Sequence, residues 1–373
     1  MSAPLSGVRV VALEQAVAAP LCTRHLADLG AEVTKVERPD GDFARRYDTV
    51  ALGHSAYFVW LNHGKRSVAL DLTLARDREA FEALLADADV FVHNLGPGAV
   101  ERLGYGWDAL HARWPRLIVC AISGFGSEGP YKSRKAFDLL LQAESGLLSV
   151  TGSEAEPARV GVSIADIGAG LYALSSILAC LIGRTRDAEG RFIDISLLDS
   201  LAEWMTVPVY YELYGGGTPA RSGLHHNTIA PYGPYRTATG PDVILAIQNE
   251  GQWERFCRLV LGQPEIATDP RFATNADRVV HREELNVLID ASLGCRDRPA
   301  VEGALRDADV PYASLNSVRD LIDHPQLKER GRWTTIKTAT GPIAGLMPPF
   351  NIAGHRPDPG AVPQLPTESD GKS

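Results

Sequence analysis

The sequence predicts an α/β protein with a large Rossmann-like domain, built on a mostly parallel sheet, and a smaller α+β domain. Three observations lead to this prediction. Short Val- and Ile-rich runs alternate with helical segments over residues 1–126, as expected for parallel strands covered by helices on both faces. A glycine-rich break near Gly215 is followed by a more mixed pattern. The length of 373 residues, with 45% hydrophobic side chains, suffices for two hydrophobic cores.

The first elements set the pattern. A valine-rich strand over 7–13 is followed by a helical stretch over about 22–29, which stops at Gly30, and by a second strand that ends at Glu37. The next expected elements are a strand over 67–72, a helix over about 74–86, a strand over 89–94, a short helix begun by 96–98 and a strand over 117–126. Ligands of such sheets bind beyond the carboxyl ends of the strands, so residues that follow each strand are the first candidates for a site.

Two long helical stretches follow, over about 138–150 and 163–182, and then a further apolar segment over 191–204. The later part contains a strand over 242–248 and three helical stretches before Asp309. We therefore expect a large domain over 1–210, a linker over 211–225, a small domain over 226–325, and a return segment with a C-terminal tail over 326–373 that packs on the large domain.

Composition excludes several classes of protein. The net charge of −9 argues against nucleic-acid and anionic-membrane binding. The longest uncharged stretch, 167–183, contains glycines and serines, so we expect a buried core helix, with a membrane span as a weaker alternative. No targeting segment is expected, because Arg9 and Glu14 interrupt the apolar N-terminal stretch. The five cysteines form no CxxC pair, which fits a reducing cytoplasm.

Common cofactor motifs are missing. Glu37, at the end of the second strand, is where a dinucleotide ribose is often held, but the turn over 14–20 contains no glycine, so a nicotinamide site is not expected. The ten histidines offer only the adjacent pair His225 and His226, and neighbours in sequence rarely share one metal ion. We expect no metal site and no permanently bound cofactor.

Basic residues recur beside the strand ends. One explanation is ordinary solvated loop charge, and the other is a polyanionic ligand that carries phosphates. Recurrence after several strands favours the phosphate ligand. The residues are Lys35, Arg38, Lys65, Arg66, Arg102, Lys132, Arg134 and Lys135.

Four stretches together resemble a known family. They are LADLGAEVTKVERPDGD over 26–42, NHGKRSVALDL after Leu61, HNLGPGAVERLG over 93–104 and KAFDLLLQAESG over 135–146. In this order they closely resemble the class III CoA-transferases, which include formyl-CoA and carnitine CoA-transferases and the related α-methylacyl-CoA racemases. The resemblance runs from about residue 5 to about residue 350. It implies an enzyme, with acyl-CoA and a small carboxylic acid as its substrates, and an interlocked homodimer closed by the extended tail.

The resemblance also assigns roles to residues. Asp138 matches the family's nucleophile, which attacks the donor thioester to give a mixed anhydride and CoA thiolate; the thiolate returns to form an aspartyl-CoA thioester, and the acceptor acid reverses these steps. A structural alternative for Asp138 is a helix cap. The matching CoA contacts are Ala16, Ala18, Arg38, Lys65, Asn94 and Arg102, with a phosphate-binding cation among Lys132, Arg134 and Lys135.

Departures from the family patterns narrow the range of expected substrates and reactions. The formate branch has a glutamine in place of Val17 and a glycine run in place of 224–228. The racemase branch has a histidine before the aspartate, where this chain has Phe137, which cannot accept a proton. Racemisation is kept as the alternative function.

We therefore expect CoA transfer to a C4–C5 dicarboxylate. His225, His226 and Asn227 are expected to select it by donating hydrogen bonds to its second carboxylate, unless they form an ordinary linker. Asp166 and Glu250 match other family carboxylates and are further candidates for the acyl pocket, with a buried helical aspartate and a surface glutamate as the structural alternatives.

Overall fold

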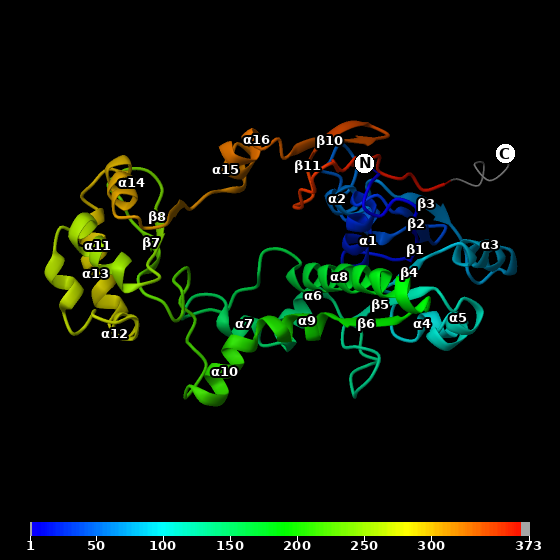
Figure 1. The fold of residues 1–373 in the computed structure, drawn as a ribbon, viewed down its shortest axis with the longest axis horizontal. Helices are drawn as coiled ribbons and strands as arrows, with labels where there is room; N and C mark the ends of the chain where they lie inside the picture. Colours follow the sequence, from blue (N-terminus) through cyan, green and yellow to red (C-terminus); the bar gives the residue numbers. More distant parts are fainter. Residues whose placement is uncertain (1, 367–373) are drawn as a thin grey trace. The chain divides into compact units, whose positions relative to one another are not determined.

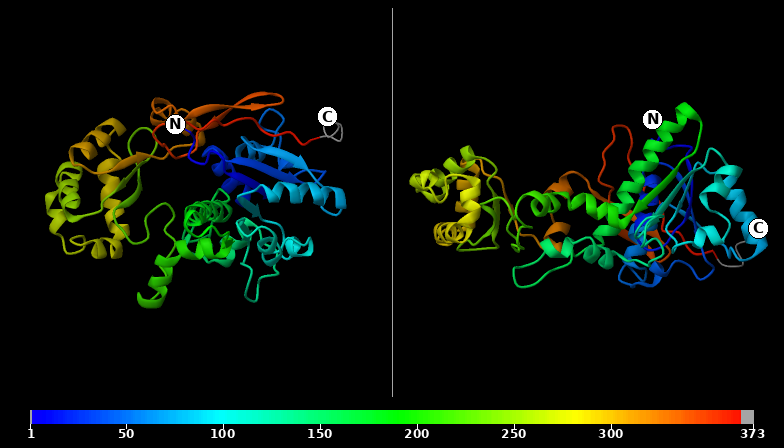
Figure 2. Two further views of the ribbon diagram at one scale, coloured as in Figure 1. Left: turned by 45° about the vertical axis from the view of Figure 1, so that its right-hand side comes forward. Right: turned by 90° about the horizontal axis from the view of Figure 1, so that it is seen from below.

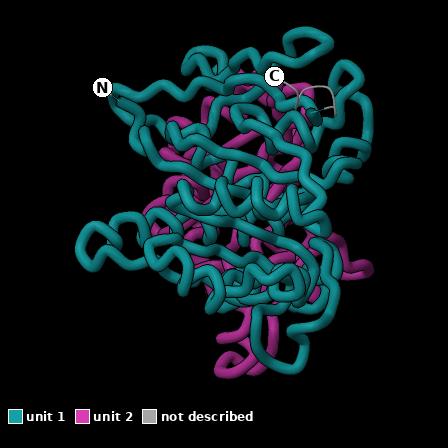
Figure 3. The backbone as a smooth tube through the Cα atoms, turned by 90° about the vertical axis from the view of Figure 1, so that its right-hand side faces the viewer, with its two compact units in different colours: residues 1–147, 160–206, 325–373 teal, residues 148–159, 207–324 magenta. Residues whose placement is uncertain are grey.

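The computed structural model describes residues 2–366, so the last residues of the expected tail, 367–373, lie outside the described part. The chain forms two compact units, coloured separately in Figure 3. Unit 1 comprises residues 1–147, 160–206 and 325–373, and unit 2 comprises 148–159 and 207–324. The expected linker over 211–225 belongs to unit 2 and starts within the helix α10 (Thr206–Tyr214).

Unit 1 is built on a six-stranded parallel sheet, as the sequence predicts. The strand order is β3-β2-β1-β4-β5-β6 (Figure 1), so the direction of strand addition reverses between β1 and β4, and ligands of such sheets bind at this point. The strands are β1 (Arg9–Leu13), β2 (Glu32–Glu37), β3 (Arg66–Ala69), β4 (Val90–His93), β5 (Ile118–Ser123) and β6 (Phe192–Ser196).

Alternate residues of these strands face two separate cores. Val10 and Ala12 of β1 pack with the helices α1 (Ala18–Asp28) and α8 (Ile164–Asp187) on one face. Val11 and Leu13 pack with α3 (Ala75–Ala86) and α5 (Trp107–Arg113) on the other. Because side chains alternate along a strand, a sheet covered on both faces needs continuous apolar runs, and β1 has one.

The remaining elements of unit 1 surround this three-layer core. A stretch expected as one helix over 138–150 is divided into α6 and α7, because Gly146 adopts a φ of 81°, a left-handed conformation that ends a helix. The elements are η1 (Phe43–Arg46), α2 (Ala56–Asn62), α4 (Ala99–Arg102), α6 (Asp138–Glu144), α7 (Leu147–Val150, shared with unit 2), α9 (Leu197–Trp204) and α16 (Pro325–Glu329).

The chain returns to unit 1 near its end, and Figure 2 shows this segment in red and orange. The hairpin of β10 (Trp333–Thr338) and β11 (Gly341–Leu346) contributes Ile336 to a small core with Phe58 of α2. The later tail is tied by backbone hydrogen bonds, including one from Gly64 N–H to Ala361 O at 2.9 Å. These contacts hold the return segment against the other parts of unit 1.

Unit 2 is of α+β type, with an antiparallel sheet in the order β7-β8-β9. Its core gathers Trp253, Phe256 and Phe272 with leucines of the surrounding helices. The elements are β7 (Tyr232–Tyr235), β8 (Val243–Ala246), β9 (Tyr312–Ser314), α11 (Glu250–Arg255), the π-helical turn η2 (Phe256–Leu261), η3 (Pro264–Thr268), α12 (Asn275–Val280), α13 (Arg282–Leu293), α14 (Arg298–Asp307) and α15 (Val318–Ile322).

α8 is long and apolar enough to pass a simple test for a membrane span, with 33% of its most apolar window buried. Within unit 1 it contacts α1, α6, α9 and β5. Gly170 lets α8 approach α1 closely, because a Cβ at this position would lie 2.6 Å from Ala18 O. These contacts agree with the prediction of a core helix.

Candidate active site

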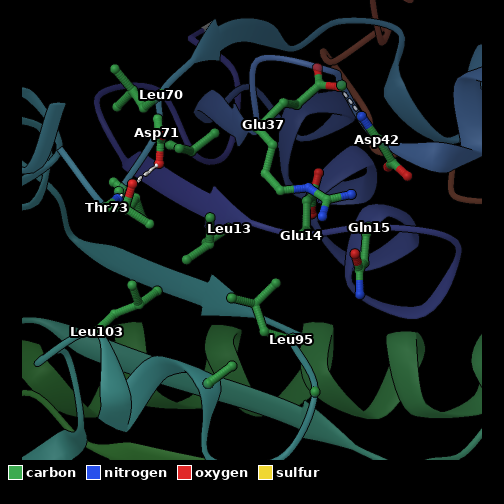
Figure 4. Close-up of a pocket in the computed structure, with 16 residues that line it drawn as sticks. Leu13, Glu14, Gln15, Glu37, Asp42, Leu70, Asp71, Thr73, Leu95 and Leu103 are labelled. Carbon is green, nitrogen blue, oxygen red and sulfur yellow. Dashed lines mark hydrogen bonds between the residues drawn. The ribbon is translucent and has the colours of Figure 1, made fainter.

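A cavity of about 300 Å³ lies at the carboxyl ends of β1 to β4 (Figure 4). Apolar side chains such as Leu13 and Leu70 form one part of its wall, and polar residues such as Gln15 and Thr73 form another. Arg38 is the one basic residue that lines it within the described chain. The lining residues are Leu13, Glu14, Gln15, Val36, Glu37, Arg38, Gly41, Asp42, Leu70, Asp71, Leu72, Thr73, Leu95, Gly96, Ala99 and Leu103.

A buried cluster of charges supports the floor of this cavity. Lys65 Nζ lies 2.7 Å from Glu14 Oε1, and Lys35 Nζ lies 2.9 Å from Asp42 Oδ2, with all four side chains fully enclosed. Burial lowers the pKa of Lys65 to about 8 although Glu14 opposes this shift. Burial alone would raise the pKa of Glu14, but Lys65 and Lys35 hold it below its ordinary value. These four charges stabilise one another in an environment that would destabilise any one alone.

The hydrogen bonds of Lys65 within this cluster bear on its predicted contact with CoA. Its ammonium also donates to Pro20 O at 3.0 Å and to Asn62 Oδ1 at 3.2 Å, so all three protons have partners inside the protein. The CoA contact predicted for Lys65 would require it to give up at least one of these bonds.

The turn between β1 and α1 carries the other predicted contacts to the adenine end of CoA. Ala16 has a φ of 60°, which is unusual for a residue other than glycine. Asn94 holds this turn, because its side chain donates to Gln15 O at 2.8 Å and accepts from Gln15 N–H at 2.9 Å. Ala18 is buried in the first turn of α1. Asn94 therefore supports the backbone of Gln15, next to Ala16. A direct contact with CoA would use the second amide proton of Asn94 or a free lone pair of its oxygen.

The exposed basic residues differ in how many contacts their charged groups make within the protein. Arg38 is paired with Asp40 at 3.4 Å and remains 68% exposed, and Arg102 donates to Pro97 O at 3.3 Å. Arg134 contacts the rings of Phe125 and Tyr131 and pairs with Glu144 at 3.2 Å. Lys132 and Lys135 are exposed. Among the three cations of this loop, Lys132 and Lys135 are therefore the ones available to a phosphate.

Asp138 is the first residue of α6, and both of its carboxylate oxygens accept hydrogen bonds from N–H groups. Oδ1 accepts from the backbone N–H of Ala165 at 2.7 Å and of Asp166 at 3.3 Å, both in the first turn of α8. Oδ2 accepts from Nε2 of Gln142 at 2.6 Å. The preceding Phe137 is 66% exposed. Donors on both oxygens fix the orientation of the carboxyl group, and a nucleophile must be oriented toward its substrate.

Asp166 has a different environment from Asp138. Burial and the neighbouring Asp138 carboxylate raise the pKa of Asp166 from 3.8 to about 7. Carboxyl groups whose pKa is shifted in this way by burial and by a neighbouring carboxylate cluster at catalytic sites. Asp166 is thus placed beside the predicted nucleophile, whereas Glu250 belongs to unit 2, where it forms an ion pair with Arg278 at 2.8 Å.

The predicted acceptor-binding residues line a cavity of about 340 Å³ in unit 2. His226 accepts a hydrogen bond at Nδ1 from Thr228 N–H at 3.2 Å and stacks on Tyr232. Accepting at Nδ1 fixes the neutral tautomer that carries its proton on Nε2. The lining residues are Val150, Val207, Pro208, Tyr211, Pro219, His225, His226, Asn227 and Thr228.

Two residues that support these sites were not predicted from the sequence. Gln142 orients Asp138, and Arg282 donates to Asn227 O at 3.2 Å from beneath the loop. Burial, together with the charge of Arg282, lowers the pKa of His225 and of His226, so both are neutral near pH 7. Gln142 lies four residues after Asp138, which places both on one helix face, and this spacing is the signal that could have revealed it.

The comparisons with known proteins agree with the geometry. The model of the family described as CoA-transferase family III matches residues 5–367. The chain belongs to CoA-transferase family III.

Individual relatives extend this result. The chain is 35% identical to a succinate–glutarate CoA-transferase of Agrobacterium fabrum, over 91% of this chain and 87% of that protein. It is 33% identical to a succinyl-CoA:mesaconate CoA-transferase of Haloarcula hispanica, over 95% and 92%. A crystal structure of a CaiB/BaiF family protein from Brucella suis has a TM-score of 0.84 at 35% identity and covers 98% of this chain and 97% of that one.

This protein is therefore an acyl-CoA:carboxylate CoA-transferase, and CoA thioesters are substrates of such enzymes. The names of the two relatives refer to dicarboxylic acids. They do not favour the racemase alternative.

The buried pair of Lys65 and Glu14 leads to a stability prediction. Lys65→Met should lower the free energy of unfolding by about 3 kcal/mol, because it leaves the Glu14 carboxylate buried with weaker compensation. The double variant with Glu14→Gln should lose less than the sum of the single variants. Denaturant unfolding measures both effects. The exposed neighbour Arg66 supplies the control, since Arg66→Met should change stability by about 0.5 kcal/mol or less. A Lys65→Met protein of normal stability with a raised KM for acyl-CoA would instead favour the CoA contact.

The raised pKa of Asp166 predicts that Asp166→Asn increases the free energy of unfolding by an amount that depends on pH. Below about pH 4 the Asp166 carboxyl is protonated in both the folded and the unfolded state, so it does not change the free energy of unfolding. Between pH 4 and about pH 7 it ionises only in the unfolded chain. The free energy of unfolding of the wild type therefore falls over this range. The variant should therefore gain on the order of 4 kcal/mol in unfolding free energy over wild type by pH 8 and little at pH 4. Asp187→Asn is the matched control, because hydrogen bonds lower the pKa of Asp187 and its contribution has the opposite sign. A pH-independent difference for Asp166→Asn would contradict the assignment.

Proposed function

We propose that this transferase moves CoA from an acyl-CoA donor to a C4–C5 dicarboxylic acid through covalent intermediates on Asp138. The observation that carries the proposal is the carboxylate of Asp138, which heads α6 and is oriented by three N–H donors. The match of this residue to the family motif and the names of the dicarboxylate transferases support the same function.

The reaction follows from the chemistry of a carboxylate. Asp138 attacks the thioester carbonyl of the donor, the C–S bond breaks, and a mixed anhydride and CoA thiolate form. The thiolate attacks Cγ of Asp138, which releases the donor acid and leaves an aspartyl-CoA thioester. The acceptor carboxylate then attacks Cγ and displaces the thiolate, which finally attacks the acceptor carbonyl and regenerates Asp138. No proton is gained or lost overall, and water must be kept from the anhydrides.

The carboxyl ends of β1 to β4 would bind the nucleotide part of CoA. The cavity there provides apolar walls and carboxylate acceptors for an adenosine group, and Arg38 and Arg102 are exposed basic residues close to this edge. Lys132 and Lys135 add positive charge after β5. Arginine and lysine side chains at strand ends are well suited to phosphate groups.

Unit 2 would recognise the second carboxylate of the acceptor. With Nδ1 of His226 occupied by Thr228 N–H, its Nε2–H is the donor that remains. The side-chain oxygen of Asn227 accepts from Ser222, so its two amide protons remain for a ligand. Arg282 adds a full positive charge behind both residues. This arrangement of donors suits a carboxylate better than an alkyl chain.

An interlocked homodimer in the cytoplasm completes the proposal. α10 exposes a largely apolar surface that includes Val207 at 61%, Leu213 at 64% and Tyr214 at 82%. Apolar surface of this kind favours a protein partner, and a second copy of the chain is the partner that the family implies. All five cysteines are free, which is compatible with a reducing compartment.

The function is tested by replacing the nucleophile. Asp138→Asn should lower turnover by several orders of magnitude, because an amide cannot form the anhydride, while acyl-CoA binding should change little. Turnover is measured by mass spectrometry on a panel of acyl-CoA donors with mono- and dicarboxylic acids. In wild type, hydroxylamine added during turnover should convert Asp138 to a hydroxamate. A variant that keeps more than a few per cent of wild-type activity, or a label on another residue, would remove Asp138 from the mechanism.

The acceptor preference is tested on the loop of unit 2. His226→Ala and Asn227→Ala should each raise the KM for a dicarboxylate by about tenfold, with little effect on a monocarboxylate of equal length, because each removes about one hydrogen bond to the second carboxylate. Leu224→Ala is the control, since Leu224 is exposed and provides no side-chain donor. Equal losses for both acids would show that the loop only closes the site. No loss for either acid would make it an ordinary linker.

A further inference from the structure

The two oxygens of Asp138 are held by groups of different kinds. Oδ1 faces two backbone N–H groups, those of Ala165 and Asp166. These groups belong to the first turn of a 24-residue helix, α8, where backbone N–H groups lack partners within the helix and the helix dipole is positive. The donors cannot rotate away, because Ala165 is fully buried in the core of unit 1.

Oδ2 faces a side chain whose orientation is fixed from behind. Gln142 is fully buried, and its Oε1 accepts a hydrogen bond from Val160 N–H at 3.0 Å. The amide NH₂ must therefore point at Asp138, which it reaches at 2.6 Å. The backbone of Val160 thus determines which end of the Gln142 amide meets the carboxylate.

The reaction makes different demands on the two oxygens. The oxygen that attacks the donor becomes the bridging atom of the anhydride and leaves with the donor acid. The other oxygen stays on Cγ throughout, as the carbonyl of the anhydride and of the thioester. It takes the negative charge each time the thiolate or the acceptor acid attacks Cγ. Fixed donors aimed at such an oxygen accelerate the reaction, because they bind the oxyanion more strongly than the carbonyl.

We propose that the first turn of α8 is the oxyanion hole of this enzyme, with the N–H groups of Ala165 and Asp166 as its donors, and that Gln142 marks the position of the exchanged oxygen. This inference rests on the proposed covalent function. The oxygen at Oδ1 remains as carbonyl and oxyanion, and the oxygen at Oδ2 is the one that attacks. Gln142 is then a positioning residue that orients Oδ2 for attack, and it donates to the bridging oxygen as the acid departs.

The test reads the aspartyl-CoA thioester directly. The wild-type enzyme is treated with acyl-CoA, freed of the released acid, and examined by infrared difference spectroscopy with carbon-13-labelled aspartate. The thioester carbonyl should absorb at lower frequency than a thioester in water, because two N–H groups polarise it. An ester linkage in place of the amide before residue 165, made by inserting lactic acid for Ala165, removes one N–H. It should raise the carbonyl frequency and lower kcat by about 10²–10³, with little change in KM.

One matched control and two variants of Gln142 separate this role from a structural one. The same ester replacement at Ile164 removes an N–H that donates to Val162 O, so the carbonyl frequency and kcat should stay near wild-type values. Gln142→Met removes the donor to Oδ2, so formation of the thioester should slow while its carbonyl frequency stays low. Gln142→Glu keeps the size of the side chain and should recover activity as the pH falls, since only a protonated glutamate can donate to Asp138.

The outcomes distinguish the inference from the function on which it rests. A thioester that forms on Asp138 with an unshifted carbonyl, or one that is insensitive to the ester at residue 165, overturns the oxyanion hole and leaves covalent catalysis intact. A carbonyl that shifts in Gln142→Met as much as in the residue 165 ester overturns the division between the two oxygens. If no thioester forms on Asp138 at all, the proposed covalent function is wrong, and the proposed oxyanion hole is wrong as well.

Discussion

The hydrogen bonds between Asp138 and the first turn of α8 are the constraint on which the proposed covalent chemistry depends. They join the start of one helix to the start of another, so Oδ1 of the carboxylate is held by backbone N–H groups, while the side chain of Gln142 holds Oδ2. α8 is in turn packed on α1 and β5 of the central sheet. The close contact at Gly170, where only glycine fits beside Ala18 O, helps to set the position of α8. Asp138 is therefore coupled to the same core that holds the strand ends.

At the strand ends, buried polar groups hold the turn between β1 and α1 in place. Glu14, Lys35, Asp42 and Lys65 form a closed cluster beneath the cavity, and Lys35 also donates to the backbone oxygen of Glu14 at 3.2 Å. Asn94 and Asp42 hold the next residues of the same turn. A turn with no glycine can in this way keep the left-handed conformation of Ala16, because the surrounding bonds offset its cost.

In the proposed function, acceptor binding and covalent chemistry use residues from different parts of the chain. Asp138, Gln142 and the first turn of α8 all belong to unit 1, whereas His226, Asn227 and Arg282 belong to unit 2. Under this proposal, the loop that carries His226 and Asn227 can change in sequence without altering Asp138. The names of two relatives refer to different acids, glutarate and mesaconate.

The sequence by itself determined the alternation of strands and helices in the first half, because hydrophobic periodicity depends only on neighbours along the chain. It also determined the family, through motifs that include Phe137 and Asp138. Local breaks were harder to predict: Gly146 divides an expected helix because of its left-handed conformation.

Tertiary structure alone decided which charges are buried. Lys65 and Arg102 both lie beside strands in sequence, yet one is enclosed by Glu14 and Asn62 and the other is exposed. It also brought Val160 and Ala165 to the side chains of Gln142 and Asp138, contacts between residues far apart in the chain. Such contacts depend on how helices pack on a sheet, and no local pattern encodes that packing.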